Sequence, residues 1–225
     1  MKEGLKGLII CVLGGDFREI ELIHEFLAEG AQVKVVGYPP LNELEGTIRE
    51  TGVYQGIREA SVIVVGMGGL DVGGKVRTLD PESNIALTEE LLELIPVGVP
   101  LLVGTARPRL REFALKHNVN LVEVAEDEEI AIRNSIPTAE GAIQIAMEEM
   151  PITIHRCNAV VIGFGRVGIT MARVLLSLGA NTIVCARSLP QLARAQEMRA
   201  SIMHITSLAR ACANADVVFN TVPAI

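Results

Sequence analysis

Apolar runs of strand length alternate with amphipathic segments along the first part of the chain. Residues 8–13 form an uninterrupted apolar run, which a glycine-rich turn follows. In the next segment Ile20, Ile23 and Leu27 fall on one helical face, with acidic residues mostly off that face. Gly30 stands where a helix-ending glycine is expected. The pattern therefore predicts a strand, a turn and an amphipathic helix.

The same alternation continues to about residue 125. Aliphatic strands joined by helices are typical of a doubly wound parallel sheet, so the predicted fold class is α/β. Residues 70–84 have no periodicity and are predicted to form a loop. The further predicted strands are residues 32–37, 61–65, 99–103 and 120–124, and the predicted helices are residues 88–95 and 107–117.

The stretch 134–138, which contains a proline, interrupts this pattern. A helix is predicted from residue 139 to about residue 150, and a polar segment then leads into a new strand. We therefore expect two domains, residues 1–150 and residues 151–225. The first holds 13 basic and 25 acidic residues, whereas the second holds 7 basic and 2 acidic residues. The positive second domain favours an anionic ligand, although surface arginines alone would give the same balance.

Composition excludes several classes of protein. Aromatic residues make up 3% of the chain, too few for a reader of single-stranded nucleic acid, and no basic block is dense enough to suggest DNA binding. No run approaches the ~20 apolar residues of a membrane helix, and the N-terminus lacks a signal-peptide pattern. We therefore expect a cytoplasmic protein that binds neither nucleic acid nor membrane.

The cysteines and histidines indicate no metal site. The four cysteines are far apart and form no C-x-x-C pair, which favours reduced, buried thiols, with a catalytic thiol as the weaker alternative. No histidine pairs with a carboxylate at a recognisable spacing. The cysteines are Cys11, Cys157, Cys185 and Cys212.

The most informative stretch is a G-x-G-x-x-G motif that follows a short apolar strand and opens a helix. Gly163 permits the tight turn, Gly165 lets the backbone approach a pyrophosphate, and Gly168 lets the helix lie close to the strand. The helix N-terminus then offers N–H groups to phosphate. A glycine-rich turn without a ligand is the alternative. The predicted cofactor-binding residues of this loop are Gly163, Phe164, Gly165, Arg166, Val167 and Gly168.

The end of the next strand distinguishes NADP from NAD. NAD-binding Rossmann domains usually carry an acidic residue there for the ribose 2′-hydroxyl, but this chain has Arg187 and Ser188. A guanidinium and a hydroxyl attract the extra phosphate of NADP, so NADP is the expected cofactor. Ser188 and Gln191 also have capping-box spacing, and Ser188 could fill both roles.

A further strand is predicted at residues 216–219, and the loop after it is expected to pass near the nicotinamide ribose. A complete Rossmann domain has more strands on this edge, so we expect the chain to be a fragment whose second domain is partial. The predicted cofactor-binding residues of this loop are Asn220, Thr221, Val222 and Pro223.

Taken together, these motifs resemble the dipicolinate synthase A family, the pyridine-nucleotide-dependent component of dipicolinate synthases. The resemblance covers nearly the whole chain and is weakest from about residue 40 to residue 100. Its most specific parts are NSIPT-x-EG and GFGR-x-G-x-T-x-AR. The matching stretches are GGDFRE (14–19), EDEEIAIRNSIPTAEGAI (126–143), TIHRCNAVVIGFGRVGITMARVLLSLGAN (153–181), CARSLPQLARAQEM (185–198) and FNTVP (219–223).

The resemblance implies two Rossmann-like domains, arranged as in the D-2-hydroxyacid dehydrogenases, with the first as the substrate domain. It also implies a C-terminal segment, not present here, that completes the cofactor domain. The implied activity is oxidation of a dihydrodipicolinate-type intermediate of the lysine pathway to dipicolinate during sporulation, with NADP as hydride acceptor. The implied partner is the second component of the synthase, dipicolinate synthase B, and a homo-oligomer is expected.

A dicarboxylate substrate needs cationic or hydrogen-bond-donating groups. Asn134, Ser135 and Thr138 precede the predicted helix and could face a cleft, although Ser135 or Thr138 could equally cap the helix. Glu140 could act as a base, or simply be a first-turn acid. Arg18 follows the first strand and could meet a carboxylate, whereas Asp16 beside it has capping-box spacing.

Two other functions remain open from the sequence. One is another two-domain NAD(P)-dependent dehydrogenase of amino or hydroxy acids. The other is a non-catalytic NADP-binding module, such as a regulatory subunit. The glycine motif fits all three readings, since fold and cofactor do not define a substrate.

Overall fold

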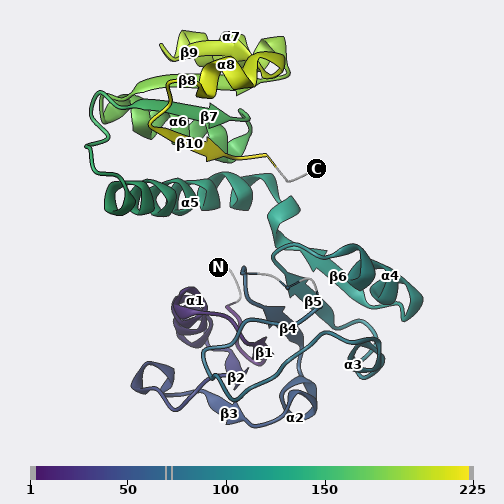
Figure 1. Ribbon diagram of the computed structural model, residues 1–225. Helices are drawn as coiled ribbons and strands as arrows, with labels where there is room; N and C mark the ends of the chain where they lie inside the picture. The colour runs from purple at the N-terminus through teal and green to yellow at the C-terminus, as the bar shows by residue number, and fades with distance from the viewer. Residues whose placement is uncertain (1–3, 69, 72, 223–225) are drawn as a thin grey trace. The chain divides into compact units, whose positions relative to one another are not determined.

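The computed structural model of the chain describes residues 4–68, 70–71 and 73–222. It divides into two compact units, Met1–Asp127 and Glu128–Ile225. In Figure 1 the first unit runs from purple to teal and the second from teal to yellow. Each unit contains one parallel β-sheet with its own apolar core.

The sheet of the first unit has the strand order β3-β2-β1-β4-β5-β6, and all of its pairings are parallel. The chain starts in the middle of the sheet, builds outward to one edge, and then crosses back to build the other half. This is the order of a doubly wound dinucleotide-binding fold. The strands are β1 (Ile9–Leu13), β2 (Gln32–Val36), β3 (Ile48–Glu50), β4 (Val62–Val65), β5 (Pro100–Val103) and β6 (Asn120–Glu123).

Alternate side chains of the central strand β1 pack into two separate apolar layers. Cys11 and Leu13 belong to one layer, whereas Ile10 and Val12 belong to the other. Apolar side chains on both faces are what a strand covered by helices on both sides requires. Helical segments of this unit are α1 (Phe17–Ala28), η1 (Asn42–Leu44), α2 (Val53–Ile57), α3 (Glu89–Glu93), α4 (Pro108–Lys116) and η2 (Val124–Glu126).

The predicted alternation of strands and helices in this unit is confirmed, and so is the loop at residues 70–84. Two isolated antiparallel β-bridges, Leu70↔Val76 and Lys75↔Ala86, connect residues in and next to this loop. Four short elements of this unit were not predicted: η1, β3 and η2, with 3 residues each, and α2, with 5 residues. Segments of this length are too short for a periodicity to show.

The sheet of the second unit has the order β10-β7-β8-β9, again entirely parallel. Read from β9 to β10, this order corresponds to β3-β2-β1-β4 of the first sheet, and the described residues of the second unit form no strands that correspond to β5 and β6. Its strands are β7 (Asn158–Ile162), β8 (Asn181–Ala186), β9 (Ser201–His204) and β10 (Val217–Asn220), and its helical segments are α5 (Glu128–Glu149), α6 (Arg166–Ser177), α7 (Leu189–Glu197), η3 (Ile205–Ser207) and α8 (Leu208–Cys212).

Helix α5 corrects one prediction. The expected break at residues 134–138 does not occur, because a single helix of 22 residues runs through Pro137. Proline removes a backbone donor from a helix interior. The hydroxyls on either side of it also donate to helix carbonyls, Ser135 Oγ to Ile132 O at 2.6 Å and Thr138 Oγ1 to Asn134 O at 2.7 Å.

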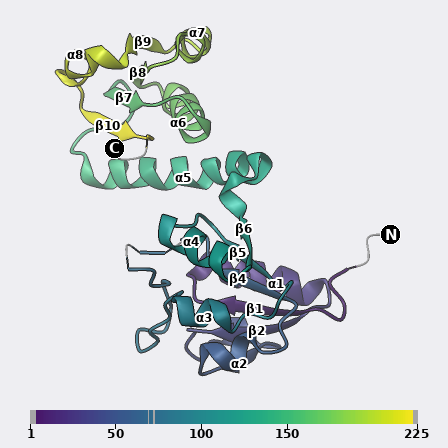
Figure 2. The same ribbon diagram turned by 90° about the vertical axis from the view of Figure 1, so that its right-hand side faces the viewer.

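The boundary between the units also differs from the expected one near residue 150. It falls between Asp127 and Glu128, so that α5 belongs to the second unit. The reason is packing: Ala139, Ile143 and Ala146 of α5 are buried in the core of that unit. Figure 2 shows α5 running beneath β10 and α6. Over the described ranges 4–68, 70–71 and 73–222, no helix has the length and apolar character needed to cross a membrane.

Candidate functional site

The β7–α6 loop makes a tight turn that only glycine accommodates well. Gly163 has φ +93°, in the left-handed region that disfavours side chains. A Cβ atom there would lie 2.7 Å from Thr221 Oγ1 and from Val222 Cγ1. The Gly163 N–H donates to Cys185 O at 2.8 Å, which fixes the loop over the end of β8. Gly163 therefore makes the tight turn expected of it.

Gly168 and Gly165 meet two further requirements. A Cβ on Gly168 would lie 2.4 Å from Gly163 O, so its absence lets α6 lie against the loop. Gly165 is the N-cap of α6, and a Cβ there would meet nothing within 4 Å. No side chain caps this helix, so its first N–H groups remain available to an anion. These three positions fit a dinucleotide pyrophosphate.

A pocket of about 750 Å³ opens beside this loop, within the ~300–1,000 Å³ range of small-molecule sites. It lies at the carboxyl ends of β7, β8 and β10, and β7 and β10 are the pair at which the strand order reverses. Ligands of open α/β sheets bind at such a reversal. The lining residues are Gly163, Phe164, Gly165, Cys185, Ala186, Arg187, Ser188, Gln191, Ile205, Thr221 and Val222.

Arg187 is exposed at the pocket and forms no ion pair with any residue that the structure describes. Ser188 is the N-cap of α7, but its side chain makes no capping hydrogen bond. The capping box expected between Ser188 and Gln191 is therefore not formed. Both the guanidinium and the hydroxyl are left with donors for another group.

The β10 end of the pocket is held by Thr221. Its Oγ1 and its N–H both donate to Ile162 O, at 2.8 and 2.9 Å. Asn220 Oδ1 accepts the Val222 N–H at 3.2 Å, which closes a turn over the pocket. The expected residue Pro223 lies outside the described residues.

Three residues of the glycine motif do not line the pocket. Arg166 is exposed and its Nη1 lies 3.5 Å from Glu128 Oε2. Val167 is half-buried, and Gly168 is buried. The loop therefore presents Gly163, Phe164 and Gly165 to a ligand.

The four candidate substrate residues near α5 lie inside the helix, not at its start. None of them is a cap, and Glu140 is not in the first turn, contrary to those alternatives. Ser135 is 1% exposed, and its Oγ lies 2.7 Å from Thr170 Oγ1. That hydroxyl therefore joins α5 to α6 and does not face solvent. Thr138 and Glu140 are exposed, and Asn134 is half-buried.

At the end of β1, Asp16 forms the expected capping box with Glu19. Arg18 is not free, because its Nε and Nη2 donate to the two Asp16 carboxylate oxygens at 2.9 and 2.8 Å. The hydrogen bond from Arg18 lowers the pKa of Asp16 to about 2, so the carboxylate stays ionised at neutral pH. Arg77 approaches the same carboxylate, with Nη1 3.7 Å from Oδ2.

Residues 9–125 match the family model of the dipicolinate synthase A N-terminal domain. The chain is 32% identical over 220 residues to dipicolinate synthase A of Bacillus subtilis (strain 168), an alignment that covers 97% of this chain and 74% of the relative. The chain belongs to the dipicolinate synthase A family.

Two solved structures of dipicolinate synthase A have the same fold. The protein from Bacillus halodurans has a TM-score of 0.85 at 35% identity, covering 98% of this chain and 76% of that one. The protein from Bacillus subtilis has a TM-score of 0.82 at 31% identity, covering 100% and 76%. A transhydrogenase from Sinorhizobium meliloti shares the fold alone, at 13% identity and a TM-score of 0.62.

A second family model indicates the class of cofactor. Residues 134–225 match the NAD binding domain of D-isomer specific 2-hydroxyacid dehydrogenases. The second unit of this dipicolinate synthase A family member is therefore a Rossmann-like NAD(P)-binding domain of oxidoreductase type, and the expected α/β fold with two parallel sheets is confirmed.

Sequence reasoning missed Arg77, Gln191 and Ile205. Gln191 and Ile205 line the pocket, and each follows a strand of the second sheet at its carboxyl end. That position was the available signal, since such ends meet at one edge of a parallel sheet. Arg77 lies in a loop without periodicity, and no local pattern places it beside Asp16.

Three of the four cysteines of this family member are buried, as expected, and all four are free; Cys212 is half-buried. Burial raises the pKa of Cys11 to about 12, and it also raises the pKa values of Cys157 and Cys185. The thiols of Cys11, Cys157 and Cys185 therefore stay protonated at neutral pH.

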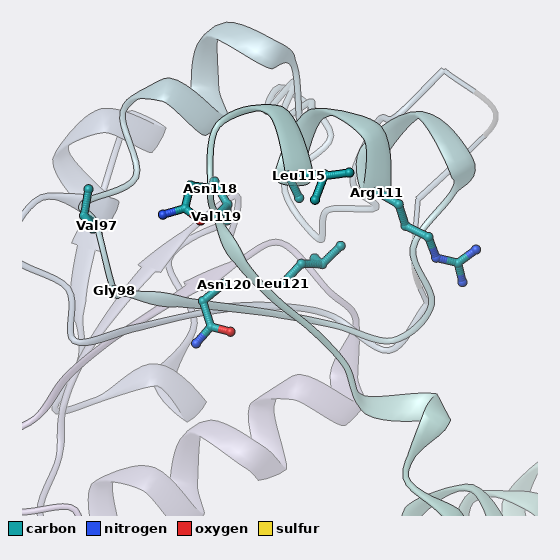
Figure 3. A pocket seen from close by; sticks show the side chains of 9 residues that line it. Val97, Gly98, Arg111, Leu115, Asn118, Val119, Asn120 and Leu121 are labelled. Carbon is teal, nitrogen blue, oxygen red and sulfur yellow. The ribbon is translucent and has the colours of Figure 1, made fainter.

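Two other features of the first unit carry no assignment. Glu89, Glu93 and His117 could together hold a metal ion, but Lys116 already pairs with Glu89. A hollow of about 550 Å³ lies between α4 and the start of β6. Figure 3 shows some of the side chains that line it, among them Leu115 and Leu121. It lies at the amino ends of β5 and β6, opposite to the edge where ligands of such sheets bind.

Proposed function

We propose that this chain is the dehydrogenase component of a dipicolinate synthase, and that it oxidises a dihydrodipicolinate-type compound to dipicolinate with NADP. The observation that carries the proposal is the pocket of the second unit. It combines the glycine turn at the β7–β10 reversal with an unpaired arginine at the end of β8. The names of the relatives supply the substrate class.

Selection of NADP rests on Arg187 and Ser188. An NAD-binding domain usually places a carboxylate here, which would repel a 2′-phosphate. Arg187 has a fixed positive charge and forms no ion pair within the described part of the chain. Ser188 adds a hydroxyl that is not used in capping. A guanidinium and a hydroxyl together favour the phosphorylated cofactor.

When bound, NADP would supply a hydride acceptor, and aromatisation of the substrate ring would favour the reaction. The residues proposed to meet the substrate are Arg18, Asn134, Thr138 and Glu140, whose side chains are exposed or half-buried. Ser135 is proposed as a positioning residue, because its hydroxyl holds α5 on α6.

The proposal extends to partners. Each of these relatives is named as a subunit of dipicolinate synthase. This supports the proposal that the working enzyme also contains a second protein, dipicolinate synthase B. We also propose a homo-oligomeric protein that acts in the cytoplasm during spore formation.

The cofactor choice is tested by titrating the chain with NADPH and with NADH and following nicotinamide fluorescence. NADPH is expected to bind more tightly. Arg187→Asp should weaken NADPH binding by tenfold or more, because a charge-assisted contact is lost and a repulsive charge is added. Arg210→Asp, an exposed arginine of α8 outside the pocket, should leave both affinities unchanged. Equal binding of the two cofactors by the parent chain would contradict the choice of NADP.

The reaction is tested separately, by assaying NADPH formation from a dihydrodipicolinate precursor with the partner protein present. Turnover that requires both the chain and NADP supports the dehydrogenase. NADP binding without turnover would instead indicate a non-catalytic NADP-binding module. Turnover only with a hydroxy or amino acid would indicate a different dehydrogenase.

A further inference from the structure

The first unit has its own strand reversal, between β1 and β4. The carboxyl ends of these strands lead into residues 14–16 and residues 66–68, and this edge is where an open α/β sheet binds its ligand. The NADP pocket of the second unit does not use it, since none of these residues lines that pocket.

This reversal is not suited to a second dinucleotide, because acidic side chains of the chain already occupy the start of α1. Asp16 Oδ1 accepts the Arg18 N–H at 3.1 Å, and Glu19 Oε2 accepts the Asp16 N–H at 2.6 Å. Glu19 is 2% exposed, and its Oε1 accepts the Met67 N–H at 2.8 Å. A pyrophosphate here would meet two carboxylates in place of free N–H groups.

Two arginines from distant parts of the chain converge at this place. Arg18 Nη2 lies 2.8 Å from Asp16 Oδ2, and a Cβ built on Gly68 would lie 3.6 Å from the same nitrogen. Arg77 Nη1 lies 3.7 Å from the same carboxylate oxygen, Asp16 Oδ2. The side chains of Arg18 and Arg77 are 57% and 72% exposed, whereas that of Asp16 is 17% exposed. Both guanidinium groups therefore keep donors directed to solvent.

The backbone holds Arg77 in place. Gly15 N–H donates to Arg77 O at 2.7 Å, and Val76 beside it is buried. A Cβ on Gly14 would lie 2.4 Å from Arg77 O, so glycine is needed for this close approach. The chain segment that carries Arg77 is thus fixed on the end of β1, far from it in the sequence.

The charges around this place favour a carboxylate group at the two arginines over a doubly charged phosphate group. Asp16 Oδ2 lies near both guanidinium groups, and the carboxylate of Glu19 is buried and bonded to backbone N–H groups. Lys75 adds a positive charge nearby, and Asp71 Oδ1 accepts two backbone N–H groups of its own loop. Asp16 would repel a dianionic phosphate group more strongly than a carboxylate group, whose two coplanar oxygens can accept from the outer guanidinium donors.

A hollow of about 340 Å³ adjoins Arg77, and it is lined by Gly68, Leu70, Asp71, Lys75, Val76, Arg77 and Thr78. Its volume lies within the ~300–1,000 Å³ range of small-molecule sites. A second, smaller hollow is lined by Gly15 and Asp16 and shares Gly68, Val76 and Arg77 with it. Apolar wall and guanidinium rim together suit a ring that carries a carboxylate.

We propose that Arg18 and Arg77 form a carboxylate-binding subsite in the first unit, which takes one carboxylate of a ring dicarboxylate of the dipicolinate type. The ligand class rests on the proposed function; the subsite rests on the geometry at the β1–β4 reversal. Asp16 is the positioning residue, since it orients both guanidinium groups.

The test is a titration of the isotopically labelled chain with dipicolinate, followed by amide NMR shifts. Shifts are expected at Gly15, Gly68 and Arg77, and Arg77→Gln should raise the apparent Kd by about tenfold or more. Arg58→Gln is the matched control, since Arg58 is also an exposed arginine of the first unit but lies outside both hollows. The same spectra show whether each variant is folded.

An unchanged Kd in Arg77→Gln, or no shifts at these amides, would overturn the subsite. Equal shifts with inorganic phosphate would overturn the carboxylate assignment. Each variant is also titrated with NADPH. Failure of NADPH to bind any form counts against the proposed function, whereas intact NADPH binding with no effect of Arg77→Gln counts against the subsite alone.

Discussion

The three glycines of the β7–α6 loop differ in what surrounds them. Gly163 and Gly168 are closed in by the chain itself, because a Cβ at either would lie under 3 Å from neighbouring atoms. Gly165 faces open space. We therefore expect Gly163 and Gly168 to be needed for folding and Gly165 to be needed for ligand binding. Substitutions of single glycines can test these two roles separately.

Gly168→Ala is expected to destabilise the second unit by about 1–3 kcal/mol, because the new methyl group would press on the Gly163 carbonyl. Gly165→Ala should cost no more than ~1 kcal/mol in stability, yet weaken NADPH binding by about tenfold or more. Chemical unfolding and cofactor titration of both variants measure the two effects. A stable Gly168→Ala variant with full affinity would show that α6 does not need this close approach.

At the residue scale, the sequence predicted what depends on neighbouring positions. The glycine turn and the Asp16–Glu19 capping box follow from local spacing, and both are present. The Ser188 capping bond had the same spacing but is absent. Arg77 could not be predicted, because its place depends on a tertiary contact with Gly15.

At the scale of elements, α5 shows how tertiary packing overrides a local rule. A proline in a helix interior normally ends or bends the helix, so a break was expected. The helix nevertheless runs through Pro137, and the face that carries Ala139 and Ile143 is buried in the core of the second unit. Packing of this kind is not visible in a propensity scale.

Ser135→Ala is expected to lower the stability of the second unit by about 1–3 kcal/mol, since one buried and one partly buried hydrogen bond are lost. Gly141→Ala is the matched control in the same helix. A methyl group there meets nothing within 4 Å, so it should raise stability by about 0.5–1 kcal/mol. Urea unfolding followed by the α5 and α6 amide signals compares them. Equal stability of Ser135→Ala and the parent would contradict the role of this hydroxyl.

The longest helices of each unit cover more than one repeat of the hydrophobic pattern, although α3, with 5 residues, was also predicted, within residues 88–95. Helices α1 and α6, with 12 residues each, display their buried faces clearly. Strand β3, with 3 residues, and helix α2, with 5, do not. Pairing with β2 and packing near β1 stabilise these short segments, and such contacts are set by the whole sheet.

At the scale of the whole molecule, the chain builds two sheets of related order and uses their reversals differently. Each sheet has a separate core, so stabilising one unit need not stabilise the other. All described residues that line the pocket beside the β7–α6 loop, where we propose that NADP binds, belong to the second unit.

NADPH at about 100 times its Kd is therefore expected to stabilise the second unit by about 2.7 kcal/mol and to leave the first sheet unchanged. Hydrogen exchange measured by mass spectrometry, with and without NADPH, should show slower exchange in β7, α6 and β8 but not in β1 and β4. Comparable slowing in both sheets would mean that cofactor binding couples the units.

The buried carboxylate of Glu19 affects how many cofactor molecules one chain is expected to bind. This carboxylate sits where an incoming phosphate would have to settle, and it is already bonded to two backbone amides. The first unit thus carries an internal anion of its own, and a chain with two nucleotide-type sheets should retain a single equivalent of cofactor.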